Sequence, residues 1–295
     1  MKKGLALCMA AVLAMGCLLT GCGSSDTGAK STTESAAAST EAVGTETAGT
    51  EAAGTETAGN GKTFTGGCDA SFPPYGYQEN GEYVGFDLDL AQEVCDRNGW
   101  ELVKPPIDWD AKNIELNGGS IDCIWNGFTM NGREDDYTWT PAYINNTQVF
   151  AVNKNSGITK AADLAGKNVL VQADSSALAA LQDEENTDIK ALADSFGSLT
   201  QVPDYESALM ELEAGSADAV AMDEGVAVAK QAKNENIKIL EDVISTEQYG
   251  IGFKLGNEEL RDQVWATLLE MEADGTVDTI AEKYSMNKDN ICIGE

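Results

Sequence analysis

The sequence predicts an α/β protein, and three observations support this fold class. From residue 62 onward, short apolar runs of strand length alternate with amphipathic segments of helix length. The alternation forms two β-α-β sets, one before residue 150 and one after it. In both sets polar residues follow the strand ends, which is where open α/β sheets bind ligands. We therefore expect parallel strands, right-handed helical crossovers and a ligand site at the strand ends.

Residues 1–22 have the pattern of a bacterial lipoprotein signal. Two lysines precede an apolar stretch at 5–19, which is too short to span a bilayer as a stable helix. The tetrapeptide L-T-G-C that ends at Cys22 resembles the lipobox, in which the cysteine becomes lipid-modified and N-terminal. Two acyl chains on Cys22 would suffice to anchor the protein at the extracytoplasmic face of the cell membrane. The alternative interpretation is an uncleaved membrane anchor.

Residues 23–61 are interpreted as a disordered tether. They consist almost entirely of Gly, Ser, Thr, Ala and Glu, with Val43 as the only large apolar residue. The pentad G-T-E-T-A at 44–48 recurs with little change at 49–53 and 54–58. Such a segment cannot bury enough apolar surface to fold, and its glutamates keep it extended.

The charge balance and the absence of histidine exclude several classes of function. The chain has 49 acidic and 19 basic side chains, a formal net charge of −30, and it has no basic stripe that would bind nucleic acid. Without histidine, the Ser-His-Asp arrangement, histidine acid–base catalysis and histidine metal ligands are all ruled out.

Four cysteines follow Cys22, and none of them forms a C-x-x-C pair. This spacing argues against a bound metal, and we expect no cofactor. An exported protein can form disulfides. Cys95 and Cys123, however, occupy apolar positions of a predicted helix and a predicted strand, which is equally compatible with buried thiols. The pairing of Cys68, Cys95, Cys123 and Cys292 stays open at this point.

The first β-α-β set begins at residue 64, and Asp87 is a plausible N-cap of its first helix. The expected elements are, in order, strand 64–68, helix 88–98, strand 101–103, helix 111–117 and strand 121–125.

Each strand of the first set is followed by residues suited to contact a ligand. Asp69 and Phe72 follow the first strand, Trp109 the second, and Asn126, Gly127 and Thr129 the third. Arg133 carries the planar guanidinium that best matches a carboxylate. On this stretch alone, a salt bridge to one of the three acidic residues at 134–136 is an alternative for Arg133. Because all three strand ends converge on one edge, we favour a site residue.

The second set adds strands at 147–152, 169–171, 218–222, 237–240 and 249–253, and helices at 161–164, 177–183, 205–214, 225–233, 258–273 and 277–284. Gln172, Ser175 and Ser176 follow one of its strands, and the serines could cap a helix, hold an anion, or both. Asp223 ends another strand. It could bind an ammonium group or serve as the N-cap of the next helix.

The residues from 62 to 287 resemble a known family. The motifs are D-A-S-F-P-P-Y-G-Y at 69–77, G-E-Y-V-G-F-D-L-D-L-A at 81–91, G-S-I-D-C-I-W-N-G-F-T at 119–129, D-L-A-G-K-N-V-L-V-Q at 163–172 and Y-G-I-G-F-K at 249–254. In this order they are similar to the bacterial extracellular solute-binding proteins of ABC transporters, polar-amino-acid branch. The resemblance implies a type II periplasmic-binding-protein-like fold, with lobe 1 at 62–148 plus 248–295 and lobe 2 at 153–246.

The resemblance also implies the function and the roles of the residues. The protein would be a monomer without enzymatic activity that captures a free α-amino acid in the cleft and delivers it to an ABC transporter permease. Phe72 would stack on the ligand, with Asp69 and Trp109 beside it. Asn126, Gly127 and Thr129 would offer further contacts, and Arg133 would clamp the α-carboxylate. Gln172, Ser175 and Ser176 would meet the carboxylate or the side chain, and Asp223 would bind the α-ammonium.

The chain departs from the family pattern at two points. Members usually have T-x-T-x-x-R, whereas Thr129 and Arg133 are separated by a loop that is one residue shorter. Asn126 replaces a frequent serine, and Phe128 is bulkier than usual. The alternatives to transport are an exported dehydratase acting on a cyclic dicarboxylic acid and an amino-acid sensor that signals to a receptor.

Overall fold

The computed structural model describes residues 61–295. The predicted signal at 1–22 and, apart from Gly61, the predicted tether at 23–61 lie outside the described residues. Within 61–295, none of the helices has both the length and the apolar character needed to cross a bilayer.

The main sheet has nine strands in the order β10-β9-β11-β8-β12-β6-β1-β5, and β7 pairs with β12 at its side. Their bounds are β1 Thr63–Gly67, β5 Glu101–Val103, β6 Cys123–Thr129, β7 Thr138–Trp139, β8 Ile144–Asn153, β9 Asn168–Gln172, β10 Ser198–Val202, β11 Ala219–Asp223 and β12 Ile237–Phe253. A separate three-stranded sheet contains β2 Ser71–Phe72, β3 Gly76–Glu79 and β4 Glu82–Val84.

The helices are α1 Phe86–Asn98, α2 Lys112–Gly118, α3 Ser176–Gln182, α4 Thr187–Asp194, α5 Tyr205–Ala214, α6 Glu224–Lys233, α7 Glu258–Ala273 and α8 Thr276–Lys283. Short 3-10 turns lie at Trp109–Ala111, Ala161–Leu164 and Lys288–Asn290.

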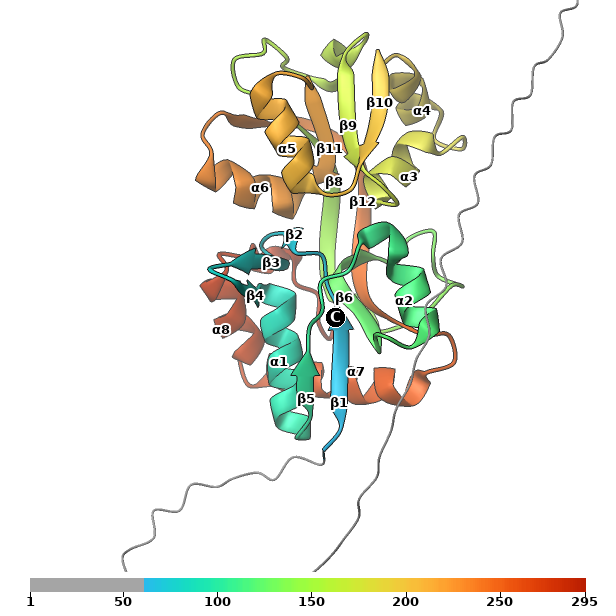
Figure 1. Cartoon of the computed structure of the whole chain (residues 1–295), viewed down its shortest axis with the longest axis vertical. Helices are drawn as coiled ribbons and strands as arrows, with labels where there is room; N and C mark the ends of the chain where they lie inside the picture. Colours follow the sequence, from blue (N-terminus) through green and yellow to red (C-terminus); the bar gives the residue numbers. More distant parts are fainter. Residues whose placement is uncertain (1–60) are drawn as a thin grey trace, which may run out of the picture. The chain divides into compact units, whose positions relative to one another are not determined.

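Two lobes share the main sheet (Figure 1). In lobe 1, β1 pairs in parallel with β5 and β6, and α1, α2, α7 and α8 accompany these strands. In lobe 2, β9 pairs in parallel with β10 and β11, and α3 to α6 accompany them. The predicted two-lobe α/β fold with parallel strands in each set is confirmed.

Two long antiparallel strands, β8 and β12, connect the lobes (Figure 1). They pair with each other from Ile144 opposite Tyr249 to Asn153 opposite Ile237. At one end β12 pairs with β6 of lobe 1, and at the other β8 pairs with β11 of lobe 2. Both strands therefore belong to both lobes, and any movement of one lobe relative to the other bends this pair.

The sequence analysis divided β12 into two strands, 237–240 and 249–253, and this was wrong. The structure has one strand with register shifts between Ile239, Val243 and Ser245. The exposed acidic residues Glu241 and Asp242 lie at this irregularity, where they interrupt the apolar pattern. Helix α4 and strand β10 were not predicted; no residue of α4 is fully buried, although Ile189 and Leu192 pack against the core of lobe 2.

The predicted role of Asp87 as a helix N-cap was also wrong. Helix α1 begins at Phe86 with Gly85 as its N-cap, and Asp87 is fully buried. Its Oδ2 atom accepts hydrogen bonds from the Gly127 amide at 2.7 Å and from the Tyr143 hydroxyl at 2.7 Å. Asp87 thus joins α1 to Gly127 of β6. The prediction that Asn126, Gly127 and Thr129 follow this strand was wrong, because β6 continues to Thr129.

The four described cysteines are free and buried. Burial raises the pKa of Cys68 and of Cys95 to about 12. A thiol with such a pKa is almost entirely protonated at neutral pH, and it is therefore a poor nucleophile. Of the two interpretations left open by the sequence, the structure shows buried thiols.

Candidate ligand-binding site

Gly127 brings the end of β6 into contact with an aromatic residue of the first loop. Its φ angle is +56°, and a Cβ atom there would lie 2.5 Å from Cε1 of Phe72, so only glycine fits without displacement. The sequence analysis expected Gly127 to contact a ligand, for which its backbone amide is the available donor. In the structure this amide donates to Asp87 and, at 3.3 Å, to the hydroxyl of Tyr143.

Asn126 is buried, and neither atom of its side-chain amide has a hydrogen-bond partner among the described residues. The amide oxygen lies against Gly76, because a Cβ atom there would be 1.8 Å from it. Buried amides are nearly always hydrogen-bonded. The donor and the acceptor of this amide are therefore both unpaired, and a contact of Asn126 with a ligand stays a prediction.

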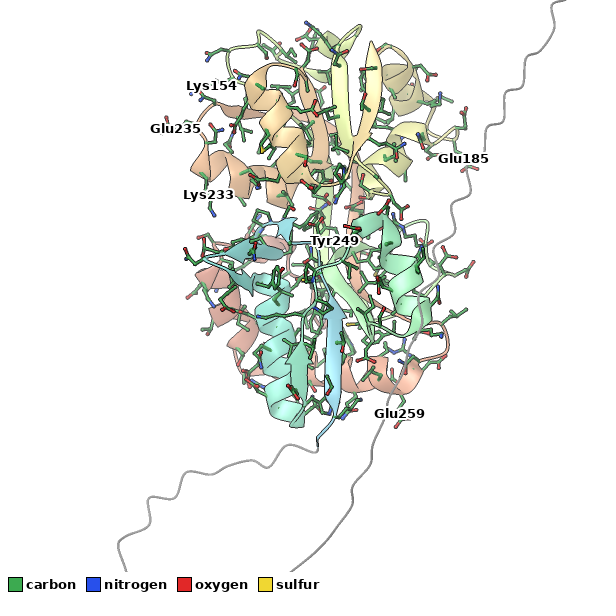
Figure 2. All side chains as sticks on the ribbon, in the orientation of Figure 1. Lys154, Glu185, Lys233, Glu235, Tyr249 and Glu259 are labelled. Carbon is green, nitrogen blue, oxygen red and sulfur yellow. The ribbon has the colours of Figure 1, made fainter. Side chains whose placement is uncertain are left out.

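Aromatic rings from both lobes meet beside Gly127 of β6. The ring of Phe72 stacks on Tyr205 of lobe 2, with centroids 5.8 Å apart and an interplanar angle of 28°. Tyr75 contacts Phe72 at 5.6 Å and the edge of Tyr249 at 5.4 Å. Tyr249 lies at the junction of the two lobes (Figure 2). The predicted stacking residue Phe72 thus belongs to an interlobe aromatic layer.

Trp109 lies in a different aromatic cluster from Phe72. Its ring meets Phe128 edge-on, with centroids 5.5 Å apart, and both pack with Tyr137 and Trp139. The bulky Phe128 noted in the sequence therefore fills the core of lobe 1. The Nζ atom of Lys112 lies 4.8 Å from the centroid of the Trp109 ring, in a cation–π contact.

Lys112 is a fully buried cation that the sequence analysis did not identify. Its Nζ atom donates to the carbonyl oxygen of Trp109 at 3.0 Å and forms an ion pair with Asp174 of lobe 2. Burial lowers the pKa of Lys112, and the hydrogen bond to Asp174 partly offsets this. Lys112 and Asp174 therefore form an ionic contact between the lobes.

Arg133 reaches towards the same turn of lobe 2. Its guanidinium donates to the carbonyl oxygens of Thr129 at 3.2 Å and of Asp174 at 3.3 Å, and it lies 5.4 Å from the centroid of the Phe128 ring. The described residues give it no salt bridge to the acidic side chains at 134–136. The arginine is thus directed across the lobe boundary, and its contact with a ligand stays a prediction.

Asp69 and Gln172 are brought together from opposite lobes. The amide nitrogen of Gln172 donates to Oδ2 of Asp69 at 2.7 Å, and the Ser71 amide donates to Oδ1 at 2.8 Å. Both side chains are buried. Burial raises the pKa of Asp69, while the hydrogen bond from Gln172 lowers it.

Asp223 is buried at the end of β11 and accepts hydrogen bonds from neutral groups on two strands and a helix. These donors are Asn146 at 2.9 Å and Gln148 at 2.5 Å on β8, Tyr205 at 2.8 Å on α5 and Tyr249 at 2.5 Å on β12. Asp223 is the N-cap residue of α6, but its side chain makes no capping hydrogen bond. The carboxylate is therefore directed towards the residues between the lobes and not towards the N-terminus of α6.

The two serines of the β9–α3 turn have different roles. Ser175 is buried and caps α3 by accepting a hydrogen bond from the Leu178 amide at 3.2 Å. The hydroxyl oxygen of Ser176 accepts a hydrogen bond from Gln148 at 2.9 Å, which links it to Asp223. Of the two, Ser176 is the one directed towards the other candidate residues.

A pocket of about 470 Å³ brings part of this set together. Thr129 and Arg133 of lobe 1, Ser176 of α3 and Glu247 of β12 all line it. Glu247 is buried and was not among the predicted site residues. The charged residues that line the pocket are therefore Arg133, Asp183 and Glu247.

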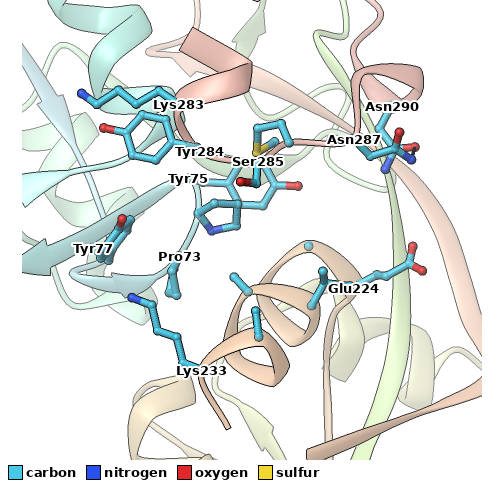
Figure 3. Close-up of a pocket in the computed structure, with 16 residues that line it drawn as sticks. Pro73, Tyr75, Tyr77, Glu224, Lys233, Lys283, Tyr284, Ser285, Asn287 and Asn290 are labelled. Atoms are coloured by element: carbon cyan, nitrogen blue, oxygen red, sulfur yellow. Dashed lines mark hydrogen bonds between the residues drawn. The ribbon is translucent and has the colours of Figure 1, made fainter. Parts of the chain in front are cut away.

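A second pocket of about 440 Å³ lies between α6 and the Pro73–Tyr77 loop (Figure 3). Lys233 projects from α6 opposite Pro73, and Tyr75, Tyr77 and Tyr284 line the other side (Figure 3). Because Tyr75 also packs on Phe72 and Tyr249, its ring lies between this pocket and the residues that donate hydrogen bonds to Asp223.

Sequence reasoning missed the polar residues of the connecting strands and the buried lysine. Gln148 lies within the strand-like run T-Q-V-F-A-V, where a polar residue at a buried position is the only signal. Tyr249 begins the Y-G-I-G-F-K motif, which was recognised without a role for the tyrosine. The sequence around Glu247 and around Lys112 contains no pattern that identifies either residue as part of a site.

The model of the bacterial extracellular solute-binding proteins, family 3, matches residues 64–287. Two curated relatives are the L-cystine-binding protein TcyJ of Escherichia coli K12 and the arginine-binding extracellular protein ArtP of Bacillus subtilis 168. The first is 27% identical, over 74% of this chain and 80% of TcyJ, and the second is 26% identical, over 74% of this chain and 84% of ArtP.

Solved structures are similar over the same part of the chain. A substrate-binding protein of an ABC uptake transporter from Streptococcus pneumoniae, with bound histidine, has a TM-score of 0.71 at 29% identity, covering 75% of this chain and 92% of that one. An ancestral arginine-binding protein bound to arginine has a TM-score of 0.66 at 35% identity, covering 75% and 97%.

Proposed function

Because the chain belongs to the bacterial extracellular solute-binding proteins, family 3, we propose that it captures a free α-amino acid and delivers it to an ABC transporter permease. The observation that carries the amino-acid part is the pairing of opposite charges near one pocket: Arg133 and Ser176 line the pocket, and Gln148 joins Ser176 to the buried carboxylate of Asp223. The carboxylate and the ammonium group of a zwitterionic amino acid would each meet a protein group of opposite charge. The names of the relatives, which bind cystine, arginine and histidine, agree with this class of ligand.

Each candidate residue has a proposed role. Arg133 and Ser176 hold the α-carboxylate, and Asp223 holds the α-ammonium, because carboxylates are strong acceptors for N⁺–H donors. Phe72 and Asn126 contact the rest of the ligand. Asp69, Trp109, Gly127, Thr129, Gln172 and Ser175 shape the cleft or support these groups.

The lobes at 62–148 plus 248–295 and at 153–246 would close on the ligand by bending β8 and β12. The closed, loaded monomer would then be recognised by the permease. We propose that the ligand leaves chemically unchanged, since no residue of the pocket is assigned a catalytic task.

We expect binding of one or a few of the twenty amino acids to raise the thermal stability of residues 60–295. Ligand at about 100 times its Kd adds roughly 2.7 kcal/mol to the unfolding free energy. Arg133→Ala should weaken binding by roughly tenfold to hundredfold, because hydrogen bonds to charged groups contribute about 1.5–3 kcal/mol.

Arg97→Ala is the matched control, since Arg97 pairs with Glu93 and Asp274 away from the pocket. Calorimetric titration of the three proteins measures the affinities, and mass spectrometry of the recovered ligand tests for turnover. Absence of binding by every amino acid would refute the proposed function. A chemically altered product would favour the dehydratase alternative.

We also propose that lipid on Cys22 attaches the protein to the outer face of the cell membrane. In cells that process lipoproteins, the full chain should partition into detergent with the membrane fraction. Cys22→Ser should move most of the protein into the soluble fraction, because a single acyl chain or none gives only weak anchoring. An unchanged distribution of the variant would contradict lipid anchoring.

A further inference from the structure

Glu247 and Asp223 form a buried carboxylate pair between the lobes. The amide nitrogen of Asn146 donates to both, at 2.8 Å and 2.9 Å, and so does the amide nitrogen of Gln148, at 2.7 Å and 2.5 Å. Because they share the same two donors, the accepting oxygens lie within about 5 Å of each other. Asp223 is 3% exposed and Glu247 is 6% exposed, so water screens their repulsion poorly.

None of the ion pairs among the described residues involves either carboxylate. All their hydrogen-bond donors are neutral amides and phenols. Buried charges are normally paired with an opposite charge. Burial and the neighbouring Glu247 raise the pKa of Asp223 to about 7. This direction agrees with the absence of a cationic side chain beside Asp223 among the described residues.

Gln148 supplies a second, independent sign that a donor is missing at this place. Its side chain is fully buried, and its Oε1 atom has no hydrogen-bond partner among the described residues. The same amide group contacts both carboxylates through its nitrogen. A cationic N–H donor from a ligand would find three acceptors here, from Asp223, Glu247 and Gln148.

The charges of the pocket are not balanced by a neutral amino acid. Lys112 pairs with Asp174, which leaves Arg133 as the cation that lines the pocket with Glu247. Under the proposed function, Arg133 takes the α-carboxylate and Asp223 takes the α-ammonium. The buried charge of Glu247 then has no counterpart unless the ligand carries a second positive group.

We infer that Glu247 is a specificity-determining residue that selects amino acids with a positively charged side chain. This inference rests on the proposed function and narrows its ligand class. Asp223 would hold the α-ammonium, and Glu247 would accept hydrogen bonds from the ammonium or guanidinium group of the side chain.

The test uses two pairs of ligands whose members have similar shape and differ by one charge: L-arginine with L-citrulline, and L-ornithine with L-norleucine. Isothermal titration of the wild-type protein should show at least one cationic member binding about thirtyfold more tightly than its neutral partner. In Glu247→Gln the ratio should fall below about threefold, mainly by loss of affinity for the cationic ligand. Glu241→Gln, on an exposed position of the same strand, should leave the ratio unchanged.

The outcomes separate the inference from the proposed function. Binding of some other amino acid, with no preference for the cationic member of either pair, overturns the inference and keeps the function. A strong preference that persists in Glu247→Gln also overturns it, because another residue then selects the charge. Failure to bind any amino acid refutes the proposed function itself. If Glu247→Gln does not fold, Glu247→Asp replaces it, and an unchanged preference for the cationic ligand after the carboxylate is withdrawn by one methylene overturns the inference.

Discussion

Replacing Gly225 by alanine should weaken ligand binding without destabilising the protein. Gly225 lies in the first turn of α6 in lobe 2, and a Cβ atom there would be 2.5 Å from the hydroxyl oxygen of Tyr75 in lobe 1. The nearest ring carbons would be at 3.0 and 3.1 Å. The methyl group thus obstructs the contact between the lobes, at a cost of about 1–3 kcal/mol, which corresponds to a loss of affinity of roughly fivefold to 150-fold.

Within α6 itself the same substitution is favourable, since alanine in a helix is up to about 1 kcal/mol better than glycine. The melting temperature without ligand should therefore stay constant or rise while the affinity falls. Adding Tyr75→Phe removes the nearest atom of the contact and should restore part of the affinity. An affinity unchanged by Gly225→Ala would show that the Tyr75–Gly225 contact is not part of the ligand-bound form.

The ligand-free protein should become less stable as the pH rises from about 4 to 7. Asp87 is fully buried, and burial raises its pKa from 3.8 to about 7. Between these values the folded protein keeps a proton that the unfolded chain has released, so the unfolding free energy decreases with increasing pH. The contribution of Asp87 is fully present below pH 3.8 and is lost through pH 7, with an upper limit of about 4 kcal/mol.

Asp87→Asn should reduce this dependence, because an amide keeps an acceptor for the Gly127 amide and the Tyr143 hydroxyl but cannot ionise. Chemical unfolding at several pH values between 4 and 8 measures the effect. Asp96→Asn is the control, since Asp96 is exposed on the same helix and should leave the slope unchanged. Equal slopes for the wild type and Asp87→Asn would contradict the raised pKa.

The parts of the fold that follow from local pattern were predictable. Neighbouring residues specify the apolar runs of β6, β9 and β11. They also specify helices such as α5, which Asp204 caps. The continuity of β12 was not predictable in this way. Its middle contains exposed Glu241 and Asp242, and its pairing with β8 across both lobes is what keeps those residues in a strand.

The candidate site residues were likewise predictable where local sequence identifies them, and not predictable where a contact forms only on folding. Arg133, Asp223 and Phe72 were identified from residue type and from their position after strands, which local sequence reveals. Helix α2 shows why Lys112 was missed: the lysine is fully buried, whereas Ile114 on the same helix is 76% exposed. This inverts the usual amphipathic pattern, and its cause is Asp174, which is 62 residues away in the sequence. Such a pairing exists only after folding.

Glu247, which is proposed to hold the positively charged side chain of the ligand, and its two hydrogen-bond donors lie on the strands that join the lobes. Asn146 and Gln148 are on β8 and Glu247 is on β12, whereas Arg133 belongs to lobe 1. If the lobes rotate about these strands, the charged side chain of the ligand stays near the axis, and the contact of Arg133 with the α-carboxylate determines how far the rotation proceeds. The angle between the lobes then reports the length of the bound molecule. A permease that contacts both lobes could reject a ligand of the wrong size without touching it.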